Sequence, residues 1–257
     1  MPGSNKKYYW SKFARSYDES TEYVIGKPLR QAVRARLLQE GDLGRLVEFG
    51  CGTGFFTEVI AGKAVHVLAT DISSEMLQVA GERLARFRNI TLQVADCRKT
   101  GYSSRTFDTV IVVNVLQTID QPSLALKESS RILRSGGILL VISYTDYGLS
   151  LLEKMIIGIR YFTVFGLPPI GGIRNFSPAE MERLVEMEGF EILQSELIGG
   201  KPKAIYLKAR SIRRGSLPVD TAASSGSSLV YMAAKPESGP QGVGLQAVRI
   251  SPARAHR

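Results

Sequence analysis

Residues 46–54 read Leu46-Val47-Glu48-Phe49-Gly50-Cys51-Gly52-Thr53-Gly54, an apolar strand that runs directly into a glycine-spaced turn. Glycine is needed where the backbone takes a positive φ or lets a ligand approach without a Cβ in the way. The three glycines alternate between a predicted buried strand and a helix that begins near Phe55. This arrangement brings a ligand to the carboxyl end of the strand, where open α/β sheets bind their ligands.

The spacing of this turn and the position of Glu48 indicate the kind of ligand. A turn that binds a pyrophosphate normally reads G-x-G-x-x-G, whereas here the third glycine, Gly54, comes one residue early. Glu48 lies two residues before the first glycine, and its carboxylate would repel a diphosphate but suit a cation, directly or through water. S-adenosylmethionine, with its sulfonium and α-amino group, fits this requirement.

Two further acidic residues end the next two predicted strands. Asp71 closes strand 65–70, and Asp96 closes strand 90–95. A carboxylate at the end of the second strand can accept both ribose hydroxyls, and one at the end of the third is placed to accept from an adenine amino group. Alone, each aspartate is more often a turn cap than a ligand. In register after the glycine turn, the two predict a cofactor site.

Strand and helix patterns alternate to about residue 210. The expected strands are 45–49, 65–70, 90–95, 107–113, 137–144, 190–197 and 204–209, and the expected helices are 8–17, 27–39, 55–62, 74–87 and 121–134. A capping serine, Ser177, with Pro178 at the first helical position predicts one more helix. Repeated βα units predict an α/β fold with a mostly parallel sheet and helices on both faces.

Five blocks of this sequence resemble the class I S-adenosylmethionine-dependent methyltransferases, particularly the UbiE-like, small-molecule branch. The blocks are 47–54, 70–77, 95–97, 107–116 and 133–139, and the resemblance covers roughly residues 8–210. It implies a Rossmann-like, seven-stranded sheet with a reversed last strand. It also implies that Asp71 binds the ribose, that Ile72 and Met76 flank the adenine, that Asp96 and Cys97 hold its edge, and that Asn114 lines the methionine end. The full expected cofactor-binding set is Tyr17, Glu48, Gly50, Cys51, Gly52, Gly54, Asp71, Ile72, Met76, Asp96, Cys97 and Asn114.

The aromatic stretch 8–18 resembles the Phe-x-x-x-Tyr-Asp helix that covers the cofactor in small-molecule methyltransferases. The resemblance implies that Tyr17 contacts the methionine portion and that Tyr9, Trp10 and Phe13 close the pocket. For Trp10 and Phe13, a hydrophobic anchor onto the body of the protein is an alternative. Aromatic rings near a sulfonium also gain from cation–π attraction.

The chain departs from the family where a catalytic base would lie. Many relatives carry histidines after the fourth strand, where residues 116–119 here read Leu-Gln-Thr-Ile. The two histidines of the chain are His66, at the start of a predicted strand, and His256, and neither is placed for catalysis. The side chains left to orient or polarise a substrate are those of Asp18, Gln117, Tyr144 and Asp146. The catalytic residue is therefore unassigned.

Residues 147–174 interrupt the alternation and contain an apolar run, 155–167, with Arg160 near its middle and two prolines after it. A membrane span needs about 20 apolar residues, so none is expected here. Three interpretations stay open: a lid over the substrate, a helix packed over the sheet edge, or a surface that dips into a bilayer interface. The lid is favoured because loops beyond strand ends carry specificity, and its side chains predict a lipophilic small-molecule acceptor.

Composition narrows the class of partner. The net charge is +9, with 33 basic and 24 acidic residues. The basic residues of the body are scattered among acids, which favours a solvated surface over a nucleic-acid interface. The two cysteines both fall in the predicted cofactor site, so neither a disulfide framework nor a metal set is indicated, and a reducing, cytoplasmic compartment fits. The first residues show no secretory signal.

We therefore expect a methyltransferase domain over 1–210, with a helical cover at 1–44 and a variable lid at 147–174, followed by a disordered tail at 211–257. The predicted function is S-adenosylmethionine-dependent methylation of a small, hydrophobic acceptor on O, N or C. The alternatives are a noncatalytic S-adenosylmethionine-binding protein and a methyltransferase acting on a protein or nucleic acid. A nicotinamide oxidoreductase is disfavoured by the turn spacing. Oligomeric state and peripheral membrane contact are open.

Overall fold

The computed structural model describes residues 8–169 and 171–212 of the chain. These residues belong to the first of two units, Met1–Leu217. The second unit lies outside the described residues, and so does the predicted tail 211–257 apart from its first two positions. Those two positions continue the domain, because the last strand runs to Ser211 and the Ile212 amide donates to the Gly189 carbonyl oxygen.

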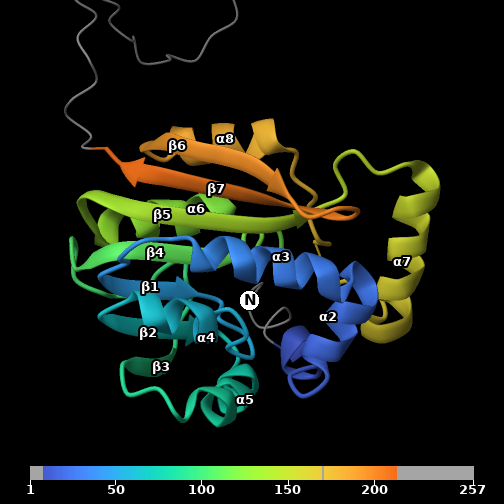
Figure 1. Cartoon of the computed structure of the whole chain (residues 1–257), viewed down its shortest axis with the longest axis horizontal. Coiled ribbons are helices and arrows are strands. Elements are labelled where there is room, and N and C mark those ends of the chain that lie inside the picture. Colours follow the sequence, from blue (N-terminus) through green and yellow to red (C-terminus); the bar gives the residue numbers. More distant parts are fainter. Residues whose placement is uncertain (1–7, 170, 213–257) are drawn as a thin grey trace, which may run out of the picture. The chain divides into compact units, whose positions relative to one another are not determined.

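A seven-stranded sheet organises the domain, with its strands in the order β3-β2-β1-β4-β5-β7-β6 (Figure 1). The strands are β1 (Arg45–Phe49), β2 (His66–Asp71), β3 (Ile90–Val94), β4 (Phe107–Val113), β5 (Leu133–Thr145), β6 (Phe190–Ile198) and β7 (Lys203–Ser211). The first five pair in parallel, and β7 runs antiparallel to both β5 and β6. The predicted mostly parallel sheet with a reversed last strand is therefore confirmed.

Helices cover both faces of the sheet and its carboxyl edge. They are α2 (Tyr17–Ile25), α3 (Lys27–Leu38), α4 (Thr57–Ile60), the 3-10 turn η1 (Ala61–Lys63), α5 (Ser74–Leu84), α6 (Pro122–Ile132), α7 (Leu151–Phe165) and α8 (Pro178–Met187). Side chains of α3 and α4 join one hydrophobic core, whereas those of α6 and α8 join the core of the opposite face. A sheet buried on both faces explains why β4 reads as a continuous apolar run rather than an alternating one.

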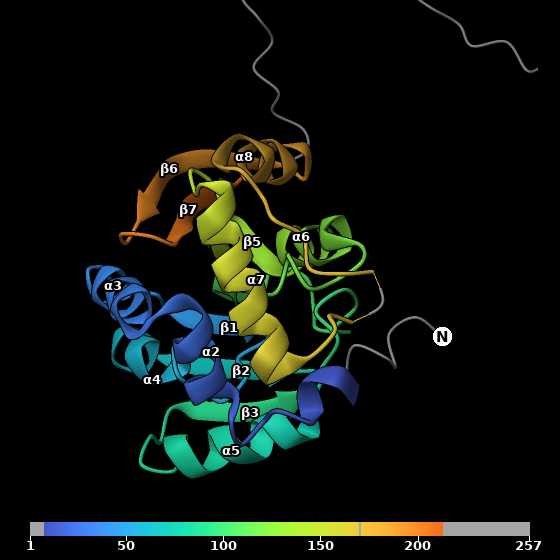
Figure 2. The ribbon, with the colours of Figure 1, turned by 90° about the vertical axis from the view of Figure 1, so that its right-hand side faces the viewer.

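The strand register brings the carboxyl ends of β1, β2, β3 and β4 to one edge. Phe49 at the end of β1 lies opposite Thr70 of β2 and Val112 of β4, and Asp71 lies opposite Val94 of β3. The loops that follow these strands therefore meet at the same side, which carries α2 and α7 on the right of Figure 1 and faces the viewer in Figure 2. This edge positions the candidate site.

The amino-terminal helix is shorter than predicted. Within the expected helix 8–17, residues 8–11 are helical, and a turn at 12–16 separates them from α2, which begins at Tyr17. The Ser11 hydroxyl lies 2.9 Å from the Ser73 hydroxyl and donates to Glu75 at 2.7 Å, so the segment is held to the start of α5 by its side chains. Bonds to a distant element override the local preference for one continuous helix.

Candidate functional site

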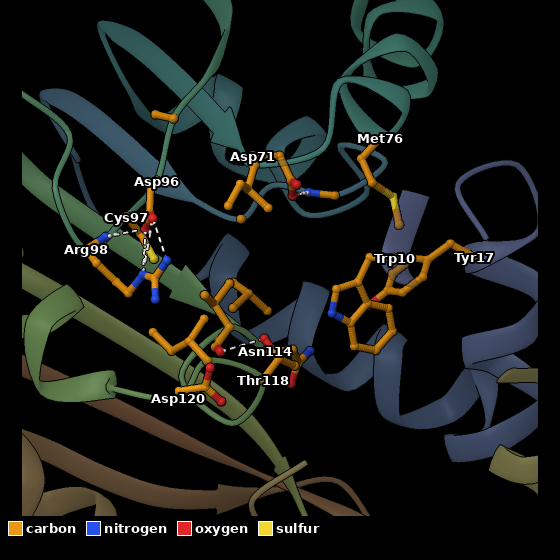
Figure 3. A pocket seen from close by; sticks show the side chains of 17 residues that line it. Trp10, Tyr17, Asp71, Met76, Asp96, Cys97, Arg98, Asn114, Thr118 and Asp120 are labelled. Atoms are coloured by element: carbon orange, nitrogen blue, oxygen red, sulfur yellow. Dashed lines mark hydrogen bonds and ion pairs between the residues drawn. The ribbon is translucent and has the colours of Figure 1, made fainter. Parts of the chain in front are cut away.

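The carboxyl edge of the sheet holds three adjoining cavities. The strand-end cavity has a volume of about 120 Å³ and lies over the ends of β1 to β4 (Figure 3). The α7 cavity, of about 480 Å³, lies under α7. The inner cavity, of about 40 Å³, lies behind the glycine turn. Nine residues of the predicted cofactor set line the strand-end cavity: Tyr17, Gly50, Gly52, Asp71, Ile72, Met76, Asp96, Cys97 and Asn114.

Two glycines of the turn serve different purposes. Gly52 has a φ of +55°, and a Cβ there would point toward the cavity, 4.0 Å from a ring carbon of Tyr17. Gly54 lines none of the three cavities. A Cβ at Gly54 would lie 2.8 Å from Leu84 Cδ1 and 3.3 Å from Ala80 Cβ. Gly54 is therefore required for the packing of the turn against α5, and the sequence prediction placed it in the site.

Asp71 lies at the end of β2 with its carboxylate on the strand-end cavity. One oxygen accepts from the Gly52 amide at 2.9 Å, and the other accepts from the Ser73 amide at 2.9 Å. These two bonds fix the orientation of the carboxylate and leave acceptor capacity on both oxygens. Burial raises the pKa of Asp71, although the backbone amides oppose the shift. The side chain is a rigid pair of acceptors at the cavity wall.

Asp96 follows β3 and is engaged by a neighbour that the sequence analysis did not single out. Arg98 donates from Nη2 to Asp96 Oδ2 at 2.7 Å and from Nε to Oδ1 at 3.0 Å (Figure 3). The Arg98 hydrogen bonds hold the pKa of Asp96 below its usual value despite some burial. Between them, Cys97 lines the cavity as a thiol, because burial raises its pKa to about 12. This end of the cavity thus presents a charge-paired carboxylate.

Glu48 and Cys51 line the inner cavity and not the strand-end cavity. The Thr57 hydroxyl donates to Glu48 Oε2 at 2.6 Å, and the Glu48 side chain is fully buried. Burial raises the pKa of Glu48 to about 7, with the Thr57 bond opposing the shift and the Asp71 charge adding to it. Burial likewise raises the pKa of Cys51 well above its usual value. Glu48 is therefore poised to ionise when a cation enters.

A buried arginine of α3, which the sequence analysis did not select, also faces the inner cavity. Arg30 donates from Nη2 to Asp18 Oδ1 at 2.6 Å, and Arg83 donates to the other Asp18 oxygen at 2.6 Å. The Thr53 hydroxyl donates to Asp18 at 3.0 Å, so this aspartate ties α2 to the glycine turn. Arg30 Nε and the Tyr144 hydroxyl are buried and have no hydrogen-bond partner within the described part of the chain. Both can bind a ligand.

Asn114, the residue after β4, has a left-handed φ of +56°, which is rare for a residue other than glycine. Its Oδ1 accepts from the Tyr144 amide at 2.8 Å, which fastens the side chain to the neighbouring strand β5. Strained backbone of this kind persists only where the surroundings hold it, and it clusters at functional sites. Asn114 lines all three cavities and marks their junction.

The α7 cavity has mainly apolar walls. The inward side of α7 contributes Ile157, Tyr161 and Phe165, and α2 contributes Val24 and Ile25. Its two charged wall residues neutralise each other, because Lys154 Nζ lies 3.1 Å from Asp146 Oδ2. The Gln117 amide oxygen accepts from the Ser143 hydroxyl. The cavity meets the strand-end cavity at Trp10, Tyr17, Asn114 and Thr118, which line both.

Aromatic side chains join the amino-terminal segment to α7. The Tyr9 hydroxyl lies 2.6 Å from the Tyr161 hydroxyl and donates to the Phe165 carbonyl oxygen at 3.0 Å. Trp10, Phe13 and Tyr17 lie 5.1–6.2 Å, ring centre to ring centre, from Phe165. Trp10 therefore lines the cavities, and Phe13 anchors the segment to α7.

The fold places neither His66 nor Asp18 where it could act as a catalytic base. His66 lies at the amino end of β2, opposite the site, with Nε2 3.1 Å from the Thr91 hydroxyl. Asp18 is committed to two arginines, which outweigh its burial and hold its pKa below the usual value. Over residues 8–169 and 171–212, no three His, Cys, Asp or Glu side chains gather closely enough to hold a metal ion.

Comparison with known proteins agrees with this geometry. A family model described as a methyltransferase domain matches residues 47–141. The ubiquinone/menaquinone biosynthesis C-methyltransferase UbiE of Syntrophotalea carbinolica is 26% identical over 232 residues, which cover 82% of this chain and 96% of the relative. The demethylmenaquinone methyltransferase of Tropheryma whipplei is 28% identical over 141 residues, which cover 55% of this chain and 57% of the relative.

Among solved structures, the N-methyltransferase NodS of Bradyrhizobium japonicum, in complex with S-adenosyl-L-homocysteine, has the same fold. Its TM-score is 0.56 at 18% identity, with 72% of this chain and 88% of NodS covered. The sheet order, the glycine turn and the matched domain together lead to one assignment. The chain is therefore an S-adenosylmethionine-dependent methyltransferase, and it is similar to the UbiE-like enzymes.

Proposed function

We propose that the strand-end and inner cavities bind S-adenosylmethionine and that the α7 cavity binds a small, lipophilic methyl acceptor. The observation that carries the proposal is the junction of the two larger cavities at Tyr17 and Asn114. A methyl group can pass between two bound molecules only where their cavities meet. Holding both reactants in register supplies roughly 7–11 kcal/mol of the barrier reduction.

The adenosine part fits the strand-end cavity. Asp71 presents two fixed acceptors to the ribose hydroxyls. Ile72 and Met76 give apolar surface for the adenine, and Asp96 and Cys97 lie at its far edge. Arg98 already donates to both oxygens of the Asp96 carboxylate. We propose that the adenine amino group donates to a lone pair of this carboxylate that Arg98 leaves free.

The methionine part fits the inner cavity and its mouth. The unpartnered Arg30 Nε is a donor for the methionine carboxylate. Glu48, with its pKa near 7, accepts the α-amino group directly or through a water. Tyr17 and Trp10 place aromatic rings near the position of the sulfonium, where cation–π attraction stabilises the positive charge. When bound, S-adenosylmethionine supplies a methyl group on this activated sulfonium.

The acceptor fits the α7 cavity, which has mainly apolar walls. The charged residues that line it, Lys154 and Asp146, are paired with each other. Burial of an unpaired polar group costs about 1–3 kcal/mol, so such walls select against a polar acceptor. The names of the relatives point to quinone-type rings, and a prenylated hydroxy-aromatic ring combines apolar bulk with the oxygen that the Tyr144 hydroxyl can bind. We take this class as the acceptor.

The residues of the site position the acceptor and exclude water. Burial raises the pKa of Tyr144, so its hydroxyl is a donor at neutral pH and not a base. Gln117 is held by Ser143, and Asp146 is paired with Lys154. We therefore propose an acceptor that carries its own ionisable group, a phenol or an enol, and needs orientation more than deprotonation by the protein.

We place the protein in the cytoplasm, in loose contact with a membrane. Over residues 8–169 and 171–212, none of the helices has the length and hydropathy of a membrane span. We also propose that the domain extends from the amino-terminal cover through Ile212, with residues 147–174 as the lid.

The test is transfer of labelled methyl from S-adenosylmethionine to reduced demethylmenaquinone with a short prenyl chain, with phosphoethanolamine as the polar probe. The proposal expects a methylated ring product and no product from phosphoethanolamine. A protein that binds the cofactor but methylates only the polar probe, or only protein or RNA, would overturn the acceptor assignment. Cofactor binding without any transfer would favour the noncatalytic alternative.

A further inference from the structure

We propose that the outward side of α7 docks on a lipid surface that carries anionic headgroups, and that the acceptor reaches its cavity from that surface. The outer face of α7 consists of Leu151, Leu152, Met155, Ile156, Ile159 and Phe162, which are 40–87% exposed. This inference rests on the lipophilic acceptor proposed above and adds the partner that delivers it.

The outer face is one continuous stripe. At about 100° per residue, its six positions fall within an arc of about 140° around the helix, and this arc also holds one polar residue, Thr163. Single exposed apolar residues are ordinary on a protein surface, but a contiguous apolar patch marks a site of interaction. The opposite side of the same helix, with Ile157, Tyr161 and Phe165, forms the cavity wall. Helix α7 is therefore apolar on both sides for two different reasons.

The length of α7 suits a position in the plane of a membrane surface. Its 15 residues are fewer than the roughly 20 that a span requires. A helix with an apolar face lies along the boundary between headgroups and acyl chains, with that face buried. In Figure 2, α7 runs along the front of the domain, at the side of the sheet's carboxyl edge, with its length open to the viewer. The helix is thus available for contact along its axis.

Cationic and aromatic residues flank the outer face. Arg160 borders the stripe on α7 itself. The adjoining segment 8–16 bears no acidic residue and two exposed cations, Lys12 and Arg15, of which Arg15 lies 3.9 Å from the Glu82 carboxylate of α5. Tyr8 is 64% exposed, with Lys12 Nζ 4.3 Å from its ring centre. Juxtamembrane cations are attracted to anionic lipids, and tyrosine favours the membrane interface.

This charge pattern favours a lipid surface over a second copy of the chain. A two-fold symmetric dimer brings the same patch of both subunits together. Such a dimer would bring together two copies of a patch whose borders carry the cations Lys12 and Arg160. Anionic headgroups instead complement these cations. The Tyr9 contacts with Tyr161 and the Phe165 carbonyl hold the cationic segment beside α7, so both would meet the surface together.

The outer face is also continuous with the acceptor cavity. Phe162 belongs to both, because it is 58% exposed and lines the cavity. A lipophilic molecule that leaves the acyl chains beside Phe162 enters the cavity without crossing water. Transfer of apolar surface through water costs about 25 cal/mol per Å². A docked helix avoids this barrier for a prenylated acceptor.

The test is co-sedimentation of the full chain with vesicles of phosphatidylcholine, with and without phosphatidylglycerol. A triple variant, Leu151→Ser, Met155→Ser and Ile159→Ser, removes apolar side chains of the outer face that line none of the cavities. A matched triple control, Leu38→Ser, Val65→Ser and Met187→Ser, removes exposed apolar side chains elsewhere. The mixed vesicles should bind the native chain. The α7 variant should bind them at least about tenfold more weakly, and the control variant should bind them as the native chain does.

Three results would overturn the inference. The first is that the native chain does not bind the mixed vesicles. The second is that the control variant loses as much vesicle binding as the α7 variant. The third is that sedimentation velocity shows a dimer for the native chain and the control but not for the α7 variant. The last result would identify a second copy as the occupant. Calorimetric binding of S-adenosylmethionine by the α7 variant should equal that of the native chain. Absence of cofactor binding in the native chain would refute the proposed function, independently of the vesicle result.

Discussion

The strand-end cavity and the α7 cavity are built by different means, although they share Trp10, Tyr17, Asn114 and Thr118. The first is made by backbone: strand ends in parallel register, a glycine turn with positive φ, and amides that fix Asp71. The second is made by side chains of α2, α7 and the amino-terminal segment. Its walls depend on ring packing and on the Tyr9–Tyr161 contact.

This difference bears on what each cavity can change. Backbone geometry at a turn tolerates few substitutions, so the strand-end cavity is suited to one constant ligand. Side-chain walls can be altered without disturbing the sheet, so the α7 cavity is suited to set which acceptor is used. Substitutions in the first should abolish activity on every acceptor, and those in the second should change the acceptor.

The largest effect should come from Gly52→Val. A valine at φ +55° is strained, and its methyl groups would enter the strand-end cavity beside Tyr17. We expect S-adenosylmethionine affinity to fall about 100-fold or more, measured by calorimetry, because the ligand loses its close approach to the turn. Gly101→Val is the matched control: φ is +76° there, with nothing within 4 Å of the added Cβ. Equal losses in both variants would place the effect in folding.

Asp71→Asn should have the next largest effect. The amide side chain keeps the shape but loses the charge and one of the paired acceptors at the cavity wall. Hydrogen bonds to a charged group contribute about 1.5–3 kcal/mol, which corresponds to roughly a 10- to 100-fold loss of affinity. Asp108→Asn, at a carboxylate that accepts from the Arg45 amide away from the cavities, should leave affinity unchanged. Normal binding by the Asp71 variant would remove the ribose assignment.

Glu48→Gln should change the pH dependence of both the stability of the fold and the affinity for S-adenosylmethionine, in opposite directions. The folded-state pKa of Glu48 is raised from 4.5 to about 7, so the folded chain holds the extra proton between these values. Glu48 therefore lowers stability as pH rises through this window, and the glutamine variant should be more stable at about pH 8, by about 3 kcal/mol at most. At about pH 4, below both pKa values of Glu48, the two proteins should melt alike.

The same substitution should weaken cofactor binding at pH above 7, because the ammonium group of the ligand loses its anionic partner. In the native chain, affinity should fall as pH drops through about 7 and Glu48 becomes protonated. The variant should show a flatter pH profile. A native profile as flat as that of the variant would contradict the role of Glu48 at the methionine end.

The smallest effect should come from Ile157→Ser, in the α7 cavity. Ile157 lines this cavity and not the strand-end cavity, so the acceptor KM should rise about tenfold while S-adenosylmethionine affinity stays constant. Leu38→Ser, at an exposed position of α3, is the control. Phe165 is a poorer probe, because its buried ring touches Trp10, Phe13 and Tyr17. A fall in cofactor affinity for the Ile157 variant would mean that the cavities are not independent.

The same contrast explains what could be predicted from the sequence. Strands β1 and β4 begin and end where their apolar runs predict, and Ser177 caps α8 as expected. These features depend on local pattern. The strand-end residues of this cavity, Asp71, Asp96 and Asn114, follow from the strand pattern, because parallel register brings the carboxyl ends to one edge.

Features that depend on distant contacts were not predictable. Arg30 reads as one of several cations on a helix, and only the fold places it beside Asp18 behind the glycine turn. Gly54 reads as part of the binding turn, yet Leu84 explains it. The break after residue 11 follows from Ser11 bonding to the start of α5, and nothing in residues 8–17 indicates that partner.

In the proposed function, the glycine turn and Asp71 hold S-adenosylmethionine with its methyl group at the junction near Asn114. The most direct measurement is a calorimetric titration of the full chain with S-adenosylmethionine and, separately, with NAD. We expect one S-adenosylmethionine bound per chain, loss of that binding in Gly52→Val but not in Gly101→Val, and no heat with NAD. Binding of NAD, or S-adenosylmethionine binding that survives Gly52→Val unchanged, would contradict it.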